Sequence, residues 1–463
     1  MDRFISSRLS SDAVNRFFDR TRELNCEIHT LQIHKDGELL VRIAQDPYSC
    51  SDTPEVYSLS KMFTSTVAGI ASDMGLISTE DPVLKYFPEI ETDNRYFKMM
   101  KIRHVLSMNT GHDHCVMPLM SQSDDAARGF FSVEPKFEPG THFEYNTGAT
   151  CLMGIIISRA SGRDFFEFAC EHLFFPMGIR NVHWCRCKDG SCLCGTGLHI
   201  SSDDISKVLL MYLSNGIYNG RRILSENWIK EASAPISDTV GNGTEDWAAG
   251  YGYQLWMNYR DGFRGDGAFG QLGMILPKRN AVIAVQALAG DMQTEIDACM
   301  DLLDSADSGD GKRTDDEYAY APYEKALDDF TADAVFDLEP NGKDFTAAWV
   351  HVGDGIAAVT FSDTDGKTLT LNAGSGKWLR SSFFAREMTS IITSIMPDDI
   401  PEQIETAACY KLEDGKIVIC VRFLSCPHTE YYNITMTDDS LEIFISQGMR
   451  EDRTRQIRGR KVR

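Results

Sequence analysis

The sequence predicts two folded parts: an α+β domain, whose antiparallel sheet is flanked by helices, and a small all-β domain after it. Segments of strand-like period lie near both ends of residues 1–305, with apolar helical segments between them. This is typical of one sheet formed by the two ends with a helical lobe packed beside it. Residues 306–317 contain one apolar side chain and are expected to be a linker. Residues 318–463 contain short strands separated by turns.

In the first part, period and turn signals give the expected elements in order. An amphipathic helix is expected over 12–24, and a hairpin follows, with strands 27–34 and 39–44 around an Asp36-Gly37 turn. The further helices are expected over 58–74, 149–161, 165–175, 202–213 and 292–303, and the further strands over 250–259, 273–276 and 281–288.

The second part is expected to be a small sandwich or barrel. Its strands are expected at 345–352, 356–361, 368–371, 405–412, 416–423, 431–436 and 441–445. The last residues, 450–463, are rich in arginine. On an acidic protein such a tail is expected to pair with its own surface or to fray, rather than to bind a polyanion.

Composition excludes several classes of function. The formal net charge of −22 argues against nucleic-acid binding, which needs a basic surface. We find no 18-residue uncharged apolar stretch, so no membrane span is expected. The N-terminus lacks an apolar signal-peptide core, and the 13 cysteines are then expected to be reduced thiols in the cytoplasm. Gly366-Lys367-Thr368 is not a phosphate-binding loop, and no cofactor is expected.

The chemistry starts at the head of the 58–74 helix. Ser58 and Lys61 are three residues apart and therefore share a helix face, so the lysine amine can reach the serine hydroxyl. A serine hydroxyl needs such a neighbour to become a nucleophile. The alternative is that Ser58 is an ordinary helix N-cap.

Two further segments carry candidate groups. Tyr145 lies where a loop meets an apolar helix, and a nearby Lys61 ammonium could lower its pKa enough to make it a base. The alternative is an ordinary half-buried tyrosine. Small residues at 265, 267, 268 and 270 let a substrate carbonyl approach the backbone of this segment closely. A backbone N–H of the segment, together with the backbone N–H of Ser58, would then form an oxyanion hole. The alternative there is a β-bulge or tight turn.

Several motifs occur in one order, which resembles the serine β-lactamase-related hydrolases: class C β-lactamases, low-molecular-weight penicillin-binding proteins, D-aminopeptidases and family VIII esterases. The matching segments are Tyr57-Ser58-Leu59-Ser60-Lys61, residues 102–111 (IRHVLSMNTG), Pro139-Gly140 through Tyr145-Asn146-Thr147, Gly195-Thr196-Gly197-Leu198 and Gly250-Tyr251-Gly252-Tyr253. The resemblance covers roughly residues 12–305.

The resemblance implies a β-lactamase/transpeptidase-like fold with the site between sheet and helical lobe. It implies Ser58 as the acylated nucleophile, Lys61 as its proton partner, and Tyr145 as general base and then acid. The N–H groups of Ser58 and Ala268 would form the oxyanion hole. Asn109, Thr147, Asp266 and Gly267 are the residues expected to contact substrate.

Two departures from the family pattern bear on substrate. Thr147 stands where an amide often contacts substrate, and the third motif reads Gly265-Asp266-Gly267, without the cation that grips a carboxylate. Asp266 would repel a carboxylate. The prediction is a serine esterase or amidase acting on small acyl or peptide-like molecules. A non-catalytic penicillin-binding-like sensor, or a D-amino-acid peptidase or β-lactamase, is the alternative.

Two other features leave alternatives open. Cys185, Cys187, Cys192 and Cys194, with His183 nearby, could hold a metal, but reduced loop thiols are the expected state. The all-β part is expected to cover one side of the site or to form a dimer face, so a homodimer is possible.

Overall fold

The computed structural model describes residues 3–308, 330–341, 345–384, 403–448 and 450–462. The chain forms two compact units. The first contains the described residues up to 308 except residues 45–49, which group with the second unit, built from the described residues after 330. The helix expected over 292–303 continues to Ser308, into the first residues of the expected linker. The rest of the expected linker, 309–317, lies outside the described residues.

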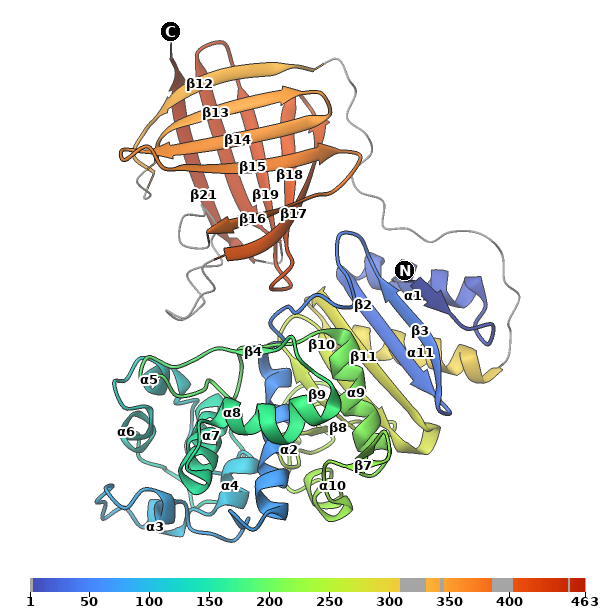
Figure 1. Cartoon of the computed structure of the whole chain (residues 1–463), viewed down its shortest axis with the longest axis vertical. Helices are drawn as coiled ribbons and strands as arrows, with labels where there is room; N and C mark the ends of the chain where they lie inside the picture. Colours follow the sequence, from blue (N-terminus) through green and yellow to red (C-terminus); the bar gives the residue numbers. More distant parts are fainter. Residues whose placement is uncertain (1–2, 309–329, 342–344, 385–402, 449, 463) are drawn as a thin grey trace. The chain divides into compact units, whose positions relative to one another are not determined.

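One antiparallel sheet organises the first unit (Figure 1). Its strand order is β1-β3-β2-β11-β10-β9-β8. The bounds are β1 (Arg3–Ile5), β2 (Cys26–Lys35), β3 (Glu38–Ala44), β8 (Trp256–Met257), β9 (Phe263–Gly267), β10 (Gln271–Leu276) and β11 (Ala281–Ala289). The pairing of β2 with β11 joins the two ends of the unit and confirms the predicted sheet. The strand expected over 250–259 is wrong, since only 256–257 pairs as β8.

Helices cover both faces of this sheet. On one face α1 (Ser11–Glu23) and α11 (Met292–Ser308) pack against each other, and Figure 1 shows them together behind the strands. On the other face lie α2 (Ser60–Asp73) and α9 (Ser202–Leu213), where a Cβ on Gly273 of β10 would stand 3.1 Å from Leu209. The sheet is therefore buried on both faces, and its strands are correspondingly apolar.

The helical lobe packs around α2, which is buried along nearly its whole length. Its buried side chains are polar as well as apolar, and the hydroxyls of Thr64 and Thr66 donate to backbone carbonyls. Gly69 makes room for a neighbour, since a Cβ there would lie 2.6 Å from Trp228. The other helices are α3 (Arg95–Met99), α4 (Ile102–Leu106), α5 (Met117–Ser121), α6 (Ala126–Phe131), α7 (Thr147–Ser161), α8 (Phe165–Ala169) and α10 (Glu226–Ala232).

The second unit is a closed barrel. Its strands follow the order β15-β14-β13-β12-β21-β20-β19-β18-β17-β16, and β15 also pairs with β17. The bounds are β12 (Ala332–Leu338), β13 (Phe345–Gly353), β14 (Ile356–Asp363), β15 (Thr368–Ser375), β16 (Leu379–Phe384), β17 (Gln403–Glu413), β18 (Lys416–Phe423), β19 (Thr429–Met436), β20 (Ser440–Gln447) and β21 (Arg450–Lys461).

The basic C-terminal segment is a strand of this barrel. β21 pairs with β20 along most of its length and with β12 on its other side. We expected this segment to pair with its own surface or to fray. That expectation did not include a strand within the barrel. Its backbone hydrogen bonds, together with the Arg458–Glu442 ion pair at 3.1 Å, fix its position.

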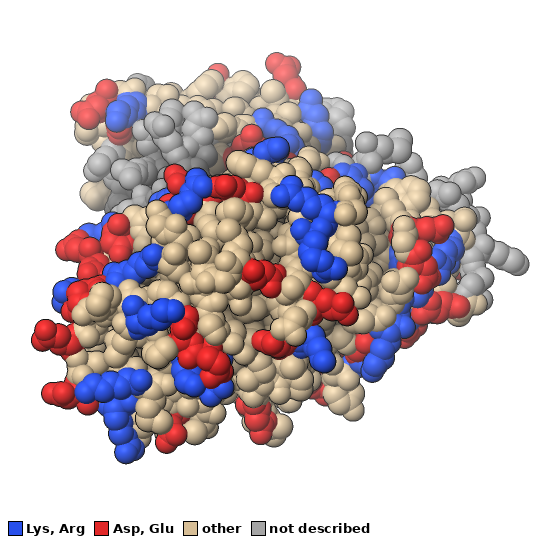
Figure 2. Space-filling view, turned by 60° about the horizontal axis from the view of Figure 1, so that its bottom comes forward, with Lys and Arg blue, Asp and Glu red and all other residues tan. Residues whose placement is uncertain are grey.

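Figure 2 views one face of the molecule, on which lysine and arginine side chains alternate with aspartate and glutamate. No large area of one sign is present among the described residues on that face. None of the helices in the described part of the chain combines the length and apolar character needed to span a bilayer.

Neighbouring residues on β20 provide a test of the barrel core. Ile443 is fully buried, whereas Phe444 is 42% exposed. Replacing Ile443 by Ala is expected to lower the free energy of unfolding by about 2–5 kcal/mol, because a buried side chain leaves a cavity. Urea unfolding followed by circular dichroism measures this loss.

Phe444→Ala is the matched control on the same strand. Because its side chain faces outward, we expect a change within about 0.5 kcal/mol. Equal losses in the two variants would contradict the inward–outward alternation assigned to β20.

Candidate active site

Ser58 lies in a short 3₁₀ turn, η1 (Tyr57–Leu59), directly before α2. The α-helix therefore starts at Ser60, two residues later than expected. The preceding Tyr57 has a φ of 46°, a left-handed conformation that is strained for a bulky residue. Such strain persists where the surrounding structure fixes the backbone, and here it presents Ser58 at the turn. The Ser58 hydroxyl accepts a hydrogen bond from Lys61 Nζ at 2.9 Å.

The Lys61 amine is the centre of the site. It is 1% exposed, and it donates to Ser58 Oγ (2.9 Å), Thr147 Oγ1 (3.1 Å) and the Gly195 carbonyl (2.7 Å). All three N–H bonds of an ammonium therefore have partners. Burial still disfavours the charged form and lowers the pKa of Lys61 to about 8. The amine can exchange a proton near neutral pH.

Tyr145 lies beside this pair, but in a different state from the one expected. Its ring stacks on Trp256 with centroids 5.6 Å apart, and the Ser58 side chain is among the groups that influence its pKa. Burial, followed by the Asp266 carboxyl, raises its pKa well above the usual range. The expected lowering by Lys61 is not found, because the amine lies over the ring face, 4.7 Å from its centroid. Tyr145 is therefore a protonated phenol.

The end of β9 lies directly against the Ser58 backbone. A Cβ on Gly267 would stand 2.2 Å from the Val56 carbonyl and 3.1 Å from Ser58 N. Only glycine permits this approach. Ala268 follows as the first residue beyond the strand and is exposed. The Ser58 and Ala268 N–H groups stay the predicted oxyanion hole, and the fit at Gly267 brings their two segments together.

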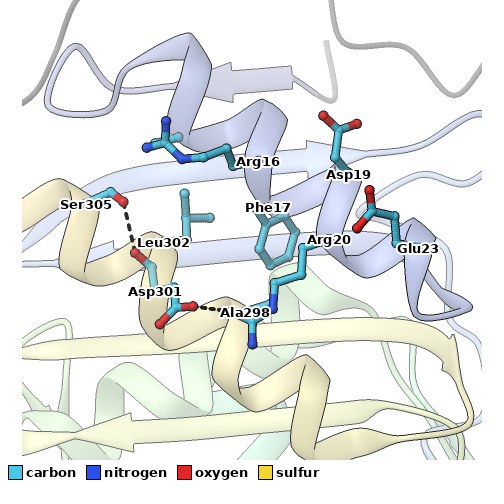
Figure 3. Close-up of a pocket in the computed structure, with 10 residues that line it drawn as sticks. Arg16, Phe17, Asp19, Arg20, Glu23, Ala298, Asp301, Leu302 and Ser305 are labelled. Atoms are coloured by element: carbon cyan, nitrogen blue, oxygen red, sulfur yellow. Dashed lines mark hydrogen bonds and ion pairs between the residues drawn. The ribbon is translucent and has the colours of Figure 1, made fainter.

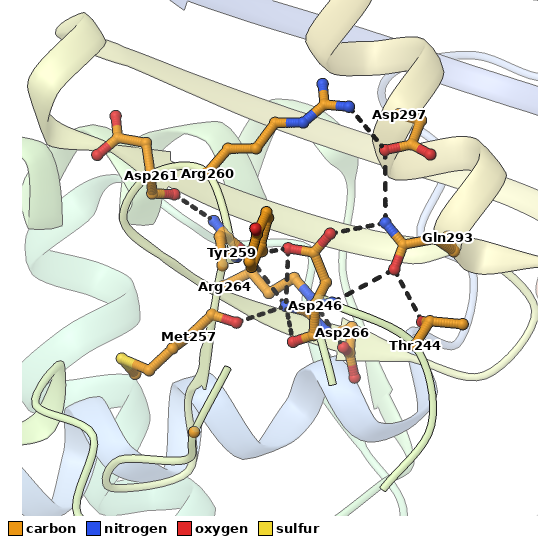
Figure 4. A network of polar contacts seen from close by, with 12 residues as sticks. Thr244, Asp246, Met257, Tyr259, Arg260, Asp261, Arg264, Asp266, Gln293 and Asp297 are labelled. Atoms are coloured by element: carbon orange, nitrogen blue, oxygen red, sulfur yellow. Dashed lines mark hydrogen bonds and ion pairs between the residues drawn. The ribbon is translucent and has the colours of Figure 1, made fainter. Parts of the chain in front are cut away.

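Asp266 faces an arginine that the sequence interpretation missed. Arg264 Nε donates to Asp266 Oδ2 at 3.0 Å, and both side chains are buried (Figure 4). The arginine also donates to the Asp246 and Met257 carbonyls and lies over the Trp247 ring at 4.5 Å. The expected repulsion of a substrate carboxylate by Asp266 is therefore weakened, because Arg264 balances its charge. Alternation along a strand places residues two apart on one face, and this signal could have found the pair.

Asn109 is separate from the catalytic groups. Its side-chain amide donates to Ser237 Oγ at 2.5 Å and to Ser107 Oγ at 3.3 Å. Its carbonyl accepts from Gly140 N at 2.8 Å. These bonds fix a loop, and in the described part of the chain no hydrogen bond connects Asn109 to Ser58 or Lys61.

The cysteine-rich loop is tightly bonded to its surroundings. Cys185, Cys187, Cys192 and Cys194 are all buried, and Cys185 Sγ lies 3.7 Å from His199 Nε2. The described residues contain no group of three or more His, Cys, Asp or Glu side chains arranged to hold a metal. Burial raises the pKa of Cys187 to about 11, so that thiol is protonated.

A surface hollow of about 380 Å³ lies between α1 and α11, away from Ser58 (Figure 3). Charges of both signs line it, and the Arg20–Asp301 ion pair crosses it. None of the groups around Ser58 lines it. This hollow is not part of the candidate active site.

Comparison with known proteins identifies the family of this chain. Residues 33–292, more than half of the chain, match the sequence profile described as Beta-lactamase. The chain belongs to that family. The 6-aminohexanoate-dimer hydrolase of Paenarthrobacter ureafaciens is 24% identical over 274 residues, which are 54% of this chain and 69% of that protein. Only 34% of the Escherichia coli (strain K12) beta-lactamase is matched, at 27% identity over 28% of this chain.

Two solved structures show the same fold. The octameric penicillin-binding protein homologue from Pyrococcus abyssi matches 96% of this chain and 99% of its own, with a TM-score of 0.52 and 15% identity. That match extends over both units. A family VIII carboxylesterase matches 66% of this chain and 98% of its own, with a TM-score of 0.52 and 17% identity. The β-lactamase/transpeptidase-like fold is thereby confirmed for the first unit.

The contact at Gly267 generates a sharp prediction. In Gly267→Ala the new methyl group would overlap the Val56 carbonyl, so β9 must move away from Ser58. We expect the reaction of Ser58 with a fluorophosphonate to slow by about 10²–10³-fold, the size of effect seen when one oxyanion donor is lost. Intact-protein mass spectrometry at timed intervals measures the rate.

Gly353→Ala is the control, because its Cβ would meet only ordinary contacts with the His351 side chain. It should label at the wild-type rate. Normal labelling of Gly267→Ala would show that the β9 edge takes no part in the reaction.

Proposed function

We propose that this protein is a serine hydrolase that forms a covalent acyl-enzyme on Ser58, and that it cleaves esters or amides of small acyl or peptide-like molecules. One observation carries the proposal. The Ser58 hydroxyl is hydrogen-bonded to a buried amine whose pKa is lowered to about 8. A base poised near the working pH is what a serine nucleophile requires.

The neutral amine of Lys61 has two N–H bonds and one lone pair. Its N–H bonds match the Gly195 carbonyl and the Thr147 hydroxyl, at 2.7 and 3.1 Å. The lone pair then faces the third partner, Ser58 Oγ. As that oxygen bonds to the substrate carbonyl carbon, its proton passes to Lys61 and the carbonyl becomes an oxyanion. The N–H groups of Ser58 and Ala268 would receive the oxyanion.

Collapse of the tetrahedral intermediate needs a proton for the leaving group. Tyr145 is protonated, and its ring lies against the Lys61 amine that contacts Ser58, so we assign its phenol as the proton donor. The departing alcohol or amine takes the phenol proton, and the Lys61 ammonium returns its proton to the phenolate. The cation over the Tyr145 ring favours the short-lived phenolate. Water then takes the place of the leaving group: its oxygen bonds to the acyl carbon while Tyr145 passes its proton to Lys61 and accepts one from the water. As the bond between the acyl carbon and Ser58 Oγ breaks, the Lys61 ammonium returns a proton to Ser58 and the carboxylic acid is released.

The substrate preference rests on where the cations lie. Lys61 is engaged by the catalytic groups, and Arg264 is buried and paired with Asp266. Neither is placed to bind a carboxylate beside β9, so neutral esters and amides are favoured over β-lactams and peptide termini. The likeness to a carboxylesterase points the same way. A sensor that binds substrate without turnover is the alternative. The altered third motif favours this alternative, and the Lys61–Ser58 bond counts against it.

The decisive experiment is intact-protein mass spectrometry after exposure to a fluorophosphonate, with p-nitrophenyl butyrate hydrolysis measured in parallel. Wild type should gain one adduct and hydrolyse the ester, whereas Ser58→Ala should lose both. No adduct on folded wild-type protein would favour the sensor. Faster turnover of a cephalosporin than of the ester would overturn the proposed substrate class.

The Lys61 pKa gives the pH dependence its sign. Because burial lowers the pKa to about 8, the fraction of neutral base rises as pH increases through that value. Log kcat/KM for the ester should therefore increase with pH and level off above about 8. Lys61→Arg, whose guanidinium stays charged, should lose at least about 10²-fold activity at every pH.

The matched comparison is Lys207→Arg, which changes a half-buried lysine on α9 that pairs with Asp204. It should keep the wild-type profile. A wild-type profile in Lys61→Arg would exclude Lys61 as the base.

A further inference from the structure

A short turn lies beside the Lys61 amine, and a buried carboxyl group contacts its other side. The turn consists of residues 195–197, and its first carbonyl accepts the Lys61 hydrogen bond of 2.7 Å. Glu55 is 7% exposed, and its Oε1 accepts hydrogen bonds from Thr196 Oγ1 and Gly197 N, both at 3.1 Å. The turn thus connects the carboxyl of Glu55 to the proposed catalytic base.

The chain on either side of this turn is bonded to the segment that carries the nucleophile. Leu198 N donates to Ser60 Oγ at 3.1 Å, and Val56 N donates to Leu198 O at 2.9 Å. Before the turn, the Cys194 carbonyl accepts from Thr64 Oγ1 at 2.8 Å. Both flanks are therefore fixed, and Glu55 holds the polar groups that lie between them.

The turn also has little room to shift. A Cβ on Gly195 would lie 2.6 Å from Thr147 Cγ2 and 2.8 Å from the Thr147 carbonyl, so the backbone is pressed against the start of α7. Gly197 has a φ of 76°, which favours glycine. Small movements of the turn would change the distance between the Gly195 carbonyl and the amine.

We propose that Glu55 is a positioning residue: its carboxylate fixes the 195–197 turn, and the carbonyl of that turn fixes the Lys61 amine. The inference rests on the proposed function, because it assigns Glu55 a role in preparing the base of that site. The neutral amine reaches Ser58 with its lone pair only while its N–H bonds are held elsewhere. Glu55 itself touches no substrate in this arrangement.

The carboxylate form suits this role better than the acid. A carboxylate accepts hydrogen bonds with both oxygens and binds donors more strongly than a neutral group, whereas the acid carries a donor of its own. Burial raises the pKa of Glu55 to about 7, and the two hydrogen bonds oppose that rise. Ionisation around neutral pH would therefore tighten the turn.

His199 is the titratable residue opposite Glu55. The backbones of the two residues form an isolated antiparallel β-bridge. Burial lowers the pKa of His199 to about 4, so it is neutral where Glu55 titrates. Its ring nitrogens contact the Thr53 carbonyl and Cys185 Sγ. On the opposite side of the turn, the Lys61 amine contacts the Gly195 carbonyl.

The test compares Glu55→Gln, Glu55→Ala and Thr196→Val with wild type, using p-nitrophenyl butyrate from pH 5 to 10. In wild type, log kcat/KM should rise with slope two below about pH 7, where Glu55 and Lys61 both lose protons, and with slope one up to about pH 8. Glu55→Gln should show slope one throughout. A merely structural role would not change the slope.

The alanine variant measures position. Glu55→Ala should lower kcat by about 10²-fold with KM within about twofold, because a misplaced base slows chemistry more than binding. Thr196→Val removes one donor and should give a smaller loss in kcat. Glu89→Gln, an exposed carboxylate paired with Arg159, is the control and should match wild type. If Glu55→Ala does not fold, Glu55→Gln and Thr196→Val decide the question.

The outcomes separate the two proposals. Wild-type slope and kcat in Glu55→Gln and Thr196→Val, with Ser58 still labelled by a fluorophosphonate, would overturn the Glu55 role alone. An unlabelled wild-type Ser58 would overturn the proposed nucleophile and, with it, the positioning role. A crystal structure of Glu55→Gln with the Lys61–Gly195 bond unchanged at 2.7 Å would argue against the role without reference to turnover.

Discussion

The Lys61 amine, on α2, lies where three other segments of the chain meet this helix. Because the amine is buried, residues of those segments must provide its hydrogen-bond partners. A charged or neutral amine in the interior needs a partner for each N–H bond. The η1 turn provides Ser58, the start of α7 provides Thr147, and the turn after the cysteine-rich loop provides a carbonyl. The same burial lowers the pKa of the amine to about 8, so the packing that encloses Lys61 also brings its proton exchange close to neutral pH.

Charge on the sheet side of the site is balanced internally. Arg264 lies between the Asp266 carboxylate, the Trp247 ring and backbone carbonyls, all within the first unit. A buried ion pair contributes little net stability but is costly to break, because one partner would remain charged in the interior. The pair therefore leaves polar groups at the β9 edge beside Ser58 while their charges nearly cancel. This differs from a site that recognises a carboxylate with a free cation.

Much of the fold was predictable because local patterns and tertiary structure agree. The alternation over 27–34 and 39–44 gave the hairpin, and the Asp36-Gly37 turn adopts the positive φ values such a turn needs. The strand within residues 450–463 was not predicted, because its composition is basic and the backbone pairing with β20 that defines it is seen only in the structure. In the site, the spacing of Ser58 and Lys61 was visible in the sequence. The contacts of Glu55, Gly195 and Arg264 were not predicted, although Gly195 lies in a motif of the family resemblance, because helix and strand periods do not encode such contacts.

The order of the strands constrains how the chain is made. The centre of the main sheet pairs β2 with β11, so Lys35 lies opposite Ala281. A ribosome must therefore synthesise nearly the whole first unit before the N-terminal hairpin finds its neighbour. Until then β2 presents an open, apolar edge, which is a site for mispairing. Contacts so distant in sequence also slow folding. The N-terminal hairpin therefore completes its pairing only after β11 has been synthesised.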